Sequence, residues 1–230
     1  VYQIASGGTS WSQLGSLPSE YEFIRAMAVG TDYTYAAESR GRVWKLASGS
    51  SIWEEIASLP SGPYNQFLFV DASDNLYAGI TSLGVYKYVG TWQAMGSLGS
   101  RDALAMDYGP DGNLWVGTND GVWRWSGSAW AAVSGTSGWD VRALKRNPLH
   151  PSRLFVGLST GAVYRYRQST GAWTEVSGLG IPSDEPVWGL ALGTGEPQRL
   201  FVGTDDGLYY TDIHHPNLTL ENDPRSQAAL

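Results

Sequence analysis

The chain has 230 residues, with 22 acidic and 15 basic side chains and a formal charge of -7. It holds no cluster of lysine and arginine that could follow a phosphate backbone, so a nucleic-acid partner is not expected. The absence of cysteine excludes disulfides and cysteine metal sites. No apolar run approaches the roughly 18 residues of a membrane-spanning helix, so we expect no membrane insertion.

The N-terminal stretch VYQIASGG has neither the basic start nor the apolar middle of a signal peptide, so no leader is expected within this chain. A leader that had been removed would leave no trace in the sequence. The lack of cysteine does not distinguish an oxidising from a reducing compartment. Our expectation for the location is secreted or periplasmic.

Related hairpin sequences follow one another along the chain, beginning with a worn copy, YTYAAESRGRVWKL, at residues 33–46. The copies after it are NLYAGITSLGVYKY, NLWVGTNDGVWRW, RLFVGLSTGAVYRY and RLFVGTDDGLYY. The apolar residue that opens the second strand of each hairpin recurs about every 41 residues, which is the repeat length of propeller blades. These residues are Val1, Val43, Val85, Val122, Val163 and Leu208.

Each repeat contains four short strand-like segments, which we label A to D. In the third full repeat they are residues 103–108, 113–118, 121–125 and 129–135, and all of them are apolar or alternating. The Asn119-Asp120-Gly121 sequence between B and C is typical of a tight hairpin turn. Packing such sheets radially covers their apolar faces, so the sequence predicts an all-β fold, a β-propeller of four-stranded antiparallel blades.

Aromatic residues are placed periodically on the C and D segments, which indicates packing between blades and not a ladder of ligand sites. The D-segment tryptophans are Trp11, Trp53, Trp92, Trp130 and Trp173, and the C-segment aromatics are Tyr2, Trp44, Tyr86, Trp123, Tyr164 and Tyr209.

Segment types A, B and D each occur five times, whereas type C occurs six times, at both ends of the chain. Five blades is the simplest interpretation, with residues 9–14 as the outer strand of the last blade, so that the N-terminal strands close the ring. Residues 1–212 then form one propeller domain and 213–230 a C-terminal tail or linker. Six or seven blades, completed by missing or swapped strands, are the alternative, and the chain is expected to be a monomer or a dimer by strand exchange.

The strings LWVGTNDGVWRW and LFVGTDDGLYY resemble the repeats of bacterial two-component-regulator-type propellers, and this resemblance implies a sensor or ligand-binding module. The segments ASGGTSW and RQSTGAW are similar to eroded Asp-box repeats of sialidase, sortilin and xyloglucanase propellers. NQFLFVDASDNLYAG, residues 65–79, resembles the repeat of tachylectin-2-like five-bladed lectins, which implies binding of N-acetylhexosamine between blades.

No catalytic constellation can be assigned, so we expect no enzyme, metal or cofactor. Glu54, Glu55 and Glu175 lie on predicted outer strands, not as the facing pair that a glycosidase needs. Three histidines, at positions 150, 214 and 215, would have to converge from distant loops to build a triad or a zinc site. Asp205-Asp206 precedes a glycine, which is typical of a hairpin turn.

The best signal for a site is a column of side chains at the start of the A segments, on the face formed by the D-A and B-C loops. This column consists of Arg25, Gln66, Ala103, Arg142 and Trp188, and most of its members are polar or bulky where a plain core would have small apolar residues. Alternatively, these side chains fill the central tunnel, with Arg25 and Arg142 paired to Asp102, Asp140 or Asp184. The candidate ligand-binding residues are Arg25, Tyr64, Gln66, Asp102, Trp139, Arg142 and Trp188.

Aromatic rings beside arginine and glutamine suit recognition of a peptide or a sugar. Because the column varies from repeat to repeat, the sequence favours a single site in a protein- or peptide-interaction or sensory module. A glycan-binding lectin is the first alternative, and an accessory or degenerate glycoside hydrolase domain is the second.

Overall fold

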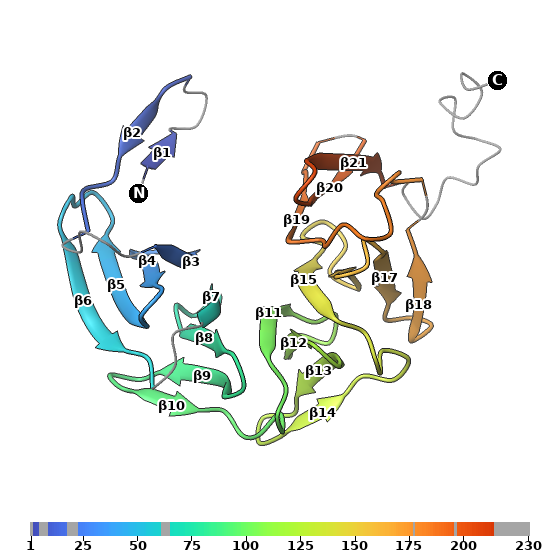
Figure 1. The fold of residues 1–230 in the computed structure, drawn as a ribbon, viewed down its shortest axis with the longest axis horizontal. Coiled ribbons are helices and arrows are strands. Elements are labelled where there is room, and N and C mark those ends of the chain that lie inside the picture. The colour runs from blue at the N-terminus through green and yellow to red at the C-terminus, as the bar shows by residue number, and fades with distance from the viewer. Residues whose placement is uncertain are drawn as a thin grey trace.

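The computed structural model describes residues 2–4, 9–17, 23–60, 65–176, 178–195 and 197–213 (Figure 1). Every regular element within these ranges is a β-strand. In four sheets each strand pairs antiparallel with the next strand along the chain. We call these sheets blades 1 to 4.

Blade 1 consists of β3 (Ile24–Val29), β4 (Tyr33–Glu38), β5 (Arg42–Ala47) and β6 (Trp53–Ser58). Blade 2 consists of β7 (Asn65–Val70), β8 (Leu76–Ile80), β9 (Gly84–Tyr88) and β10 (Trp92–Ala94). Blade 3 consists of β11 (Ala103–Tyr108), β12 (Leu114–Thr118), β13 (Gly121–Trp125) and β14 (Trp130–Ala132). Blade 4 consists of β15 (Val141–Arg146), β16 (Arg153–Leu158), β17 (Val163–Arg167) and β18 (Ala172–Glu175).

Two shorter sheets lie at the ends of the chain. The N-terminal sheet pairs β1 (Tyr2–Ile4) with β2 (Trp11–Gln13). The C-terminal sheet contains β19 (Gly189–Leu192), β20 (Arg199–Gly203) and β21 (Leu208–Asp212).

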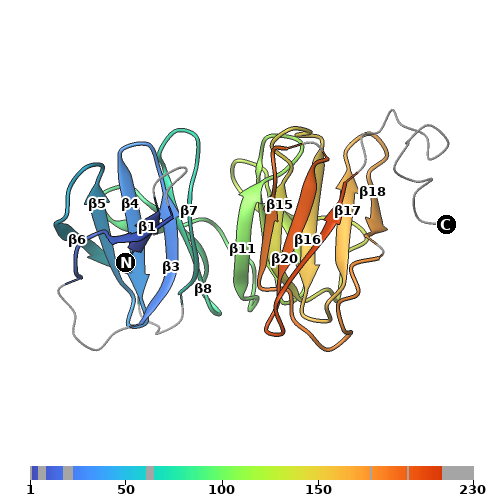
Figure 2. The same cartoon turned by 90° about the horizontal axis from the view of Figure 1, so that it is seen from above.

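The sheets stand side by side around an arc, with the A strands β3, β7, β11, β15 and β19 on its inner side and the D strands β6, β10, β14 and β18 on its outer side (Figure 1). Seen from above, the A strands run across the thickness of the arc (Figure 2). This radial array of antiparallel sheets is the architecture of a β-propeller. The predicted all-β propeller fold is therefore confirmed.

The two ends of the arc remain apart in this structure (Figure 1). Within the described residues β1 pairs only with β2, and β21 pairs only with β20. The ring closure expected from the strand count is thus not formed here, and closure and the number of five blades stay predictions. The predicted tail falls, from residue 214 onward, outside the described residues.

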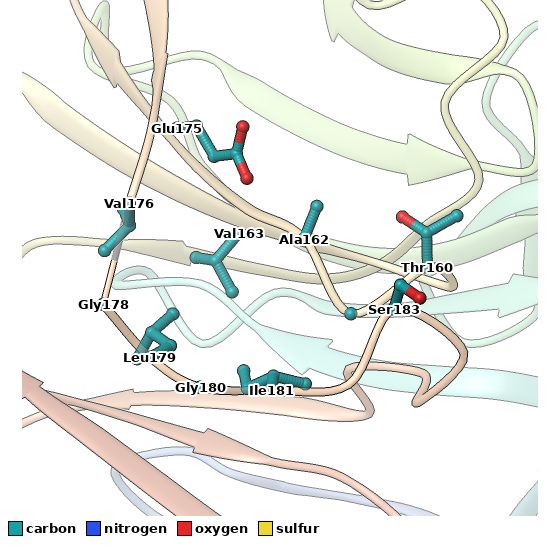
Figure 3. Close-up of a pocket in the computed structure, with 11 residues that line it drawn as sticks. Thr160, Ala162, Val163, Glu175, Val176, Gly178, Leu179, Gly180, Ile181 and Ser183 are labelled. Atoms are coloured by element: carbon teal, nitrogen blue, oxygen red, sulfur yellow. The ribbon is translucent and has the colours of Figure 1, made fainter.

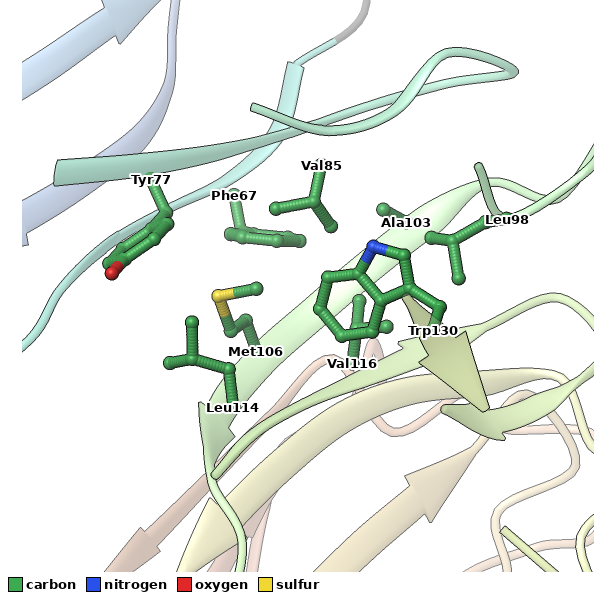
Figure 4. Packing of buried hydrophobic residues seen from close by; sticks show 9 residues of the cluster. All are labelled: Phe67, Tyr77, Val85, Leu98, Ala103, Met106, Leu114, Val116 and Trp130. Carbon is green, nitrogen blue, oxygen red and sulfur yellow. The ribbon is translucent and has the colours of Figure 1, made fainter. Parts of the chain in front are cut away.

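The core lies between the blades, as the periodic aromatics predict. Trp130 of blade 3 is only 7% exposed and packs with Phe67 and Val85 of blade 2 and with Met106 (Figure 4). The tryptophans of β6, β10 and β18 pack in the corresponding clusters of their own blades and neighbours. The exception is Trp11 on β2, which is 69% exposed because no sheet covers it among the described residues.

A recurring hydrogen bond fixes the D-strand tryptophans against the preceding sheet. The indole Nε1 of Trp53 donates to the carbonyl of Leu14 over 2.9 Å, and Trp130 donates in the same way to Met95. Trp92 makes the equivalent, longer bond to Ala57, at 3.4 Å. Each acceptor follows the preceding repeat's tryptophan by three or four residues, so in blades 1 to 3 one side chain sets the position of the blade on the preceding sheet. In blade 4 the Nε1 of Trp173 is buried without a partner among the described residues.

Candidate functional site

A β-bulge at the start of the A strand creates the predicted column. The pairing of β3 with β4 skips Arg25, and the pairing of β15 with β16 skips Arg142. Gln66 of β7 is skipped in the same way, although its side chain lies outside the described part. A bulged residue is left out of the strand ladder and its side chain can be re-aimed, which is why bulges are common beside binding sites.

The structure corrects one member of this column and explains another. In blade 3 the skipped residue is Leu104, whereas Ala103 pairs with Thr118 and is fully buried. The sequence alignment was therefore wrong by one residue in this blade. In the C-terminal sheet Gly189 pairs with Gly203, as Ala143 pairs with Gly157 in blade 4, so Trp188 occupies the column position.

Trp188 and Arg142 form the centre of the candidate site. The guanidinium carbon of Arg142 lies 5.6 Å from the centroid of the Trp188 ring. The Trp188 Nε1 donates to Asp205 Oδ1 at 2.9 Å, and an Arg142 Nη donates to Asp140 Oδ2 at 2.7 Å. Since Trp188 is still 51% exposed, these contacts fix an aromatic surface that remains open to solvent.

Two polar atoms beside this ring have no partner within the described residues. They are Arg142 Nε and Asp140 Oδ1, and both are buried. The rim pairing that the alternative interpretation predicts is thus present between Arg142 and Asp140, but it leaves one donor and one acceptor unsatisfied. Unsatisfied buried polar groups are costly, so they are suited to bonds with a ligand or ordered water.

Trp139 lies in the packing between blades. Its ring stacks on Tyr164 with centroids 4.4 Å apart and meets Trp173 edge-on at 5.3 Å. Its carbonyl also accepts a 2.7 Å hydrogen bond from the N–H of Gly121. Although the sequence places Trp139 in a loop, its ring packs between blades. No contact of Trp139 with Trp188 or Arg142 is found among the described residues.

The remaining predicted residues are spread around the same rim. Asp102 accepts hydrogen bonds from the Ser82 N–H at 2.7 Å and its hydroxyl at 3.3 Å, which connects blades 2 and 3. Arg25 lies on the exposed side of β3. Tyr64 lies outside the described residues.

Sequence reasoning missed a second aromatic and arginine pair on this face. The Arg101 guanidinium lies 4.6 Å from the Trp123 ring and donates to Asp120 Oδ2 at 2.7 Å. Asp120 also accepts from the Gly138 N–H at 2.9 Å, and this bond and Arg101 lower the pKa of the Asp120 carboxyl. The signal was an arginine two residues before the A strand β11, which the column comparison did not include.

A groove of about 570 Å³ lies where blade 4 meets the C-terminal sheet (Figure 3). Val163, Val176 and Leu179 line its apolar side, and Thr160 and Ser183 are at its edge. By repeat position the three apolar residues correspond to Val85, Met95 and Leu98, which pack with Trp130 in the interface between blades 2 and 3. The groove therefore corresponds to the place that a D-strand tryptophan fills in the earlier interface. Within the described residues the C-terminal sheet has no D strand to supply that tryptophan.

The described part of the chain contains no group of three or more histidine, aspartate or glutamate side chains that could hold a metal ion. None of its elements is a helix long and apolar enough to cross a membrane.

No known protein family matches the chain, and no curated protein is similar to it in sequence. Solved structures are similar in fold. The extracellular domain of the hybrid two-component system BT4673 from B. thetaiotaomicron is 14% identical with a TM-score of 0.66, and the match covers 84% of this chain and 27% of that one. A second structure of a BT4673 extracellular domain, described as a one-component system, is 13% identical with a TM-score of 0.69. That match covers 87% of this chain and 29% of the other.

The structure of YCF48 bound to D1 peptide is 16% identical with a TM-score of 0.63, and covers 90% of this chain and 69% of that one. At these identities the likenesses show a shared propeller fold. The chain spans about a quarter of the length of the BT4673 domain, at 27%.

Proposed function

We propose that this chain is a non-enzymatic protein- or peptide-interaction or sensory module, which binds its ligand on the face formed by the D-A and B-C loops. The observation that carries the proposal is the exposed Trp188 ring, fixed between Arg142 and Asp205 directly before β19 at the inner rim. The fold neighbours support it, because one is an extracellular domain of a two-component system and another was solved with a peptide bound.

The charges at this rim indicate the kind of peptide. Two of the described rim arginines, Arg101 and Arg142, are already paired with an aspartate. Asp102 and Asp205, in contrast, accept only neutral N–H or O–H donors among the described residues. A basic side chain could stack on Trp188 and pair with Asp205, so we propose a peptide segment that carries lysine or arginine.

Peptide binding can be tested with an array of extended peptides of varied sequence, probed with the parent chain and with Trp188→Ala. We expect binding that favours lysine- or arginine-containing peptides and that drops at least tenfold in the variant. Tyr210→Ala is a matched control, since Tyr210 is also exposed and stacked by an arginine, Arg199 at 5.0 Å, but lies outside the rim. Equal losses in both variants would contradict the proposed location.

A glycan array run with the same proteins tests the lectin alternative. Glycan binding that Trp188→Ala abolishes, with no peptide binding, would replace the peptide module by a lectin that uses the same ring. Release of sugar from a bound glycan would support the glycoside hydrolase alternative. Absence of binding on both arrays would refute a ligand site at Trp188.

A further inference from the structure

Three arginines lie together on one face of blade 4. Arg153 at the start of β16 is directly opposite Arg167 at the end of β17, and Phe155 is opposite Arg165. Directly opposite residues of antiparallel strands project from the same face, so all three arginines share the side of Phe155. Phe155 and Val163 on this side pack against the C-terminal sheet.

The three arginines are partly or wholly buried without a counter-charge. Arg153 is only 5% exposed, whereas Arg165 and Arg167 are half-buried, with their Nε atoms buried and without a hydrogen-bond partner. Among the described residues no carboxylate pairs with any of the three. Burial first, and then the charge of Arg167, lower the pKa of Arg153, and burial followed by Arg167 and Arg153 lowers that of Arg165. Arginine nevertheless stays protonated in proteins, so positive charges repel each other here.

The same position one blade earlier has the partner that blade 4 lacks. Arg124 of β13 is opposite Trp115, just as Arg165 is opposite Phe155, and it pairs with Asp111 at 3.2 Å. Asp111 comes from the loop between β11 and β12. The corresponding loop of blade 4, NPLHPS at residues 147–152, contains no carboxylate.

In the described part of the chain, the side of the arginines lacks two aromatic rings that pack on its counterpart in blade 3. There, Tyr166 of the next blade packs on Trp115 with ring centroids 5.3 Å apart, and Trp173 of β18 completes the cover. In the C-terminal sheet the position of Tyr166 is taken by the smaller Thr211, and no fourth strand follows within the described residues.

We propose that Arg153, Arg165 and Arg167 form a binding site for an oxyanion, a carboxylate or a phosphate group, between blade 4 and the C-terminal sheet. Planar guanidinium groups bind such oxygens in pairs, and an anion would supply the charge that the chain itself omits. The site lies at the ends of β16 and β17 that face away from the B-C loop, so it is separate from Trp188 and independent of the proposed peptide function. The oxyanion comes either from a free small ion or from acidic side chains of a partner protein.

Calorimetric titration of the full chain with inorganic phosphate and with a hexaglutamate peptide tests this site, at constant ionic strength and with hexaglutamine as the neutral probe. We expect saturable binding of at least one anionic probe and none of hexaglutamine. The variant carrying Arg165→Gln and Arg167→Gln should bind at least tenfold more weakly. Arg124→Gln is the matched control, because it removes an equivalent arginine that already has a partner, and it should bind like the parent.

Each result assigns or removes the site. Binding of phosphate alone identifies a small-ion site, and binding of hexaglutamate alone identifies acidic protein segments as the source. Equal binding by the double variant, or no saturable binding of either probe at millimolar concentration, would overturn the proposal. Melting temperatures keep the test independent of folding: without ligand, the double variant should melt at or above the parent temperature because it loses like-charge repulsion, whereas Arg124→Gln loses an ion pair. Trp188→Ala should leave this binding unchanged, which separates a failure here from a failure of the peptide site.

Discussion

Blade 3 and the C-terminal sheet contain similar hairpin sequences, LWVGTNDGVWRW and LFVGTDDGLYY, but their surroundings differ. Val122 of blade 3 is fully buried, whereas the equivalent Leu208 is 70% exposed. The repeat determines which side chains share a face, and the neighbouring sheet determines whether that face is covered. In a repeat array burial is therefore a property of the interface between repeats and not of the repeat itself.

The largest loss of stability should come from a substitution at the centre of the interface between blades 2 and 3. Trp130→Ala removes a buried indole and its hydrogen bond to Met95, so we expect a loss of about 3 to 5 kcal/mol in the free energy of unfolding. Urea denaturation followed by circular dichroism measures it. A loss below about 1 kcal/mol would mean that this interface does not stabilise the array.

Trp139→Ala should have the next largest effect. The sequence alone places Trp139 in a loop and predicts a much smaller loss than for Trp130. The structure stacks it on Tyr164 and against Trp173, but leaves part of the ring accessible, so we expect a loss of about 2 kcal/mol. The same urea titration measures it. A variant as stable as the parent would support the loop interpretation.

Acid stability should separate blades 2 and 3 from the C-terminal sheet. Burial would raise the pKa of Asp71, but hydrogen bonds from Asn75, Ser73 and Tyr77 outweigh it and lower the pKa below the ordinary 3.8. Asp111 is lowered in the same manner by Asn113, Trp115 and Arg124 against the effect of burial. A depressed pKa gives stability that is present above the unfolded value, so it should be lost as the pH falls below about 4.

The measurement is the melting temperature between pH 2 and 7 for the parent and for the double variant Asp71→Asn, Asp111→Asn. We expect the variant to be less stable at neutral pH, by about 1 kcal/mol for each weakened hydrogen-bond set, and to lose less on acidification. Asp205→Asn, in the C-terminal sheet, is the control for removal of a carboxylate outside blades 2 and 3. Parallel profiles for parent and double variant would mean that these two aspartates do not govern acid unfolding.

The smallest effect is expected at the open end of the arc. Trp11→Ala removes an exposed ring, so the loss should stay within about 0.5 kcal/mol while the arc is open. Closure of the ring, which we retain as a proposal, would place β2 beside β21 with Trp11 opposite Thr211 and in the groove lined by Val163, Val176 and Leu179. A loss comparable to that of Trp130→Ala would therefore establish closure, and light scattering would show whether it occurs within one chain or by strand exchange.

The sequence was sufficient for the repeat, the strand types and the packing role of the D-strand tryptophans, because these follow from local patterns. It was insufficient where a side chain's role depends on register or on a neighbour. The alignment placed Ala103 where the skipped Leu104 lies, since in the apolar stretch ALAM nothing in the sequence marks which residue the strand ladder skips. Trp139, which the sequence suggested as a ligand-binding residue, has a packing role because its ring stacks on Tyr164. Neither the groove nor the unpaired arginines could be seen in the sequence, as both depend on what the next sheet omits.

The bulges at the inner rim have a consequence for how such a module diversifies. Arg25, Gln66, Leu104 and Arg142 are skipped by the strand ladder, so their exchange leaves every rung of the sheet in place. Exchange of the exposed Arg25 therefore costs little in folding, whereas Leu104 is buried and its exchange would also disturb packing. The same scaffold can acquire a new specificity by substitution at exposed positions of this column. Under the proposed function, the variation that weakens the sequence repeat at this rim would record adaptation to a ligand.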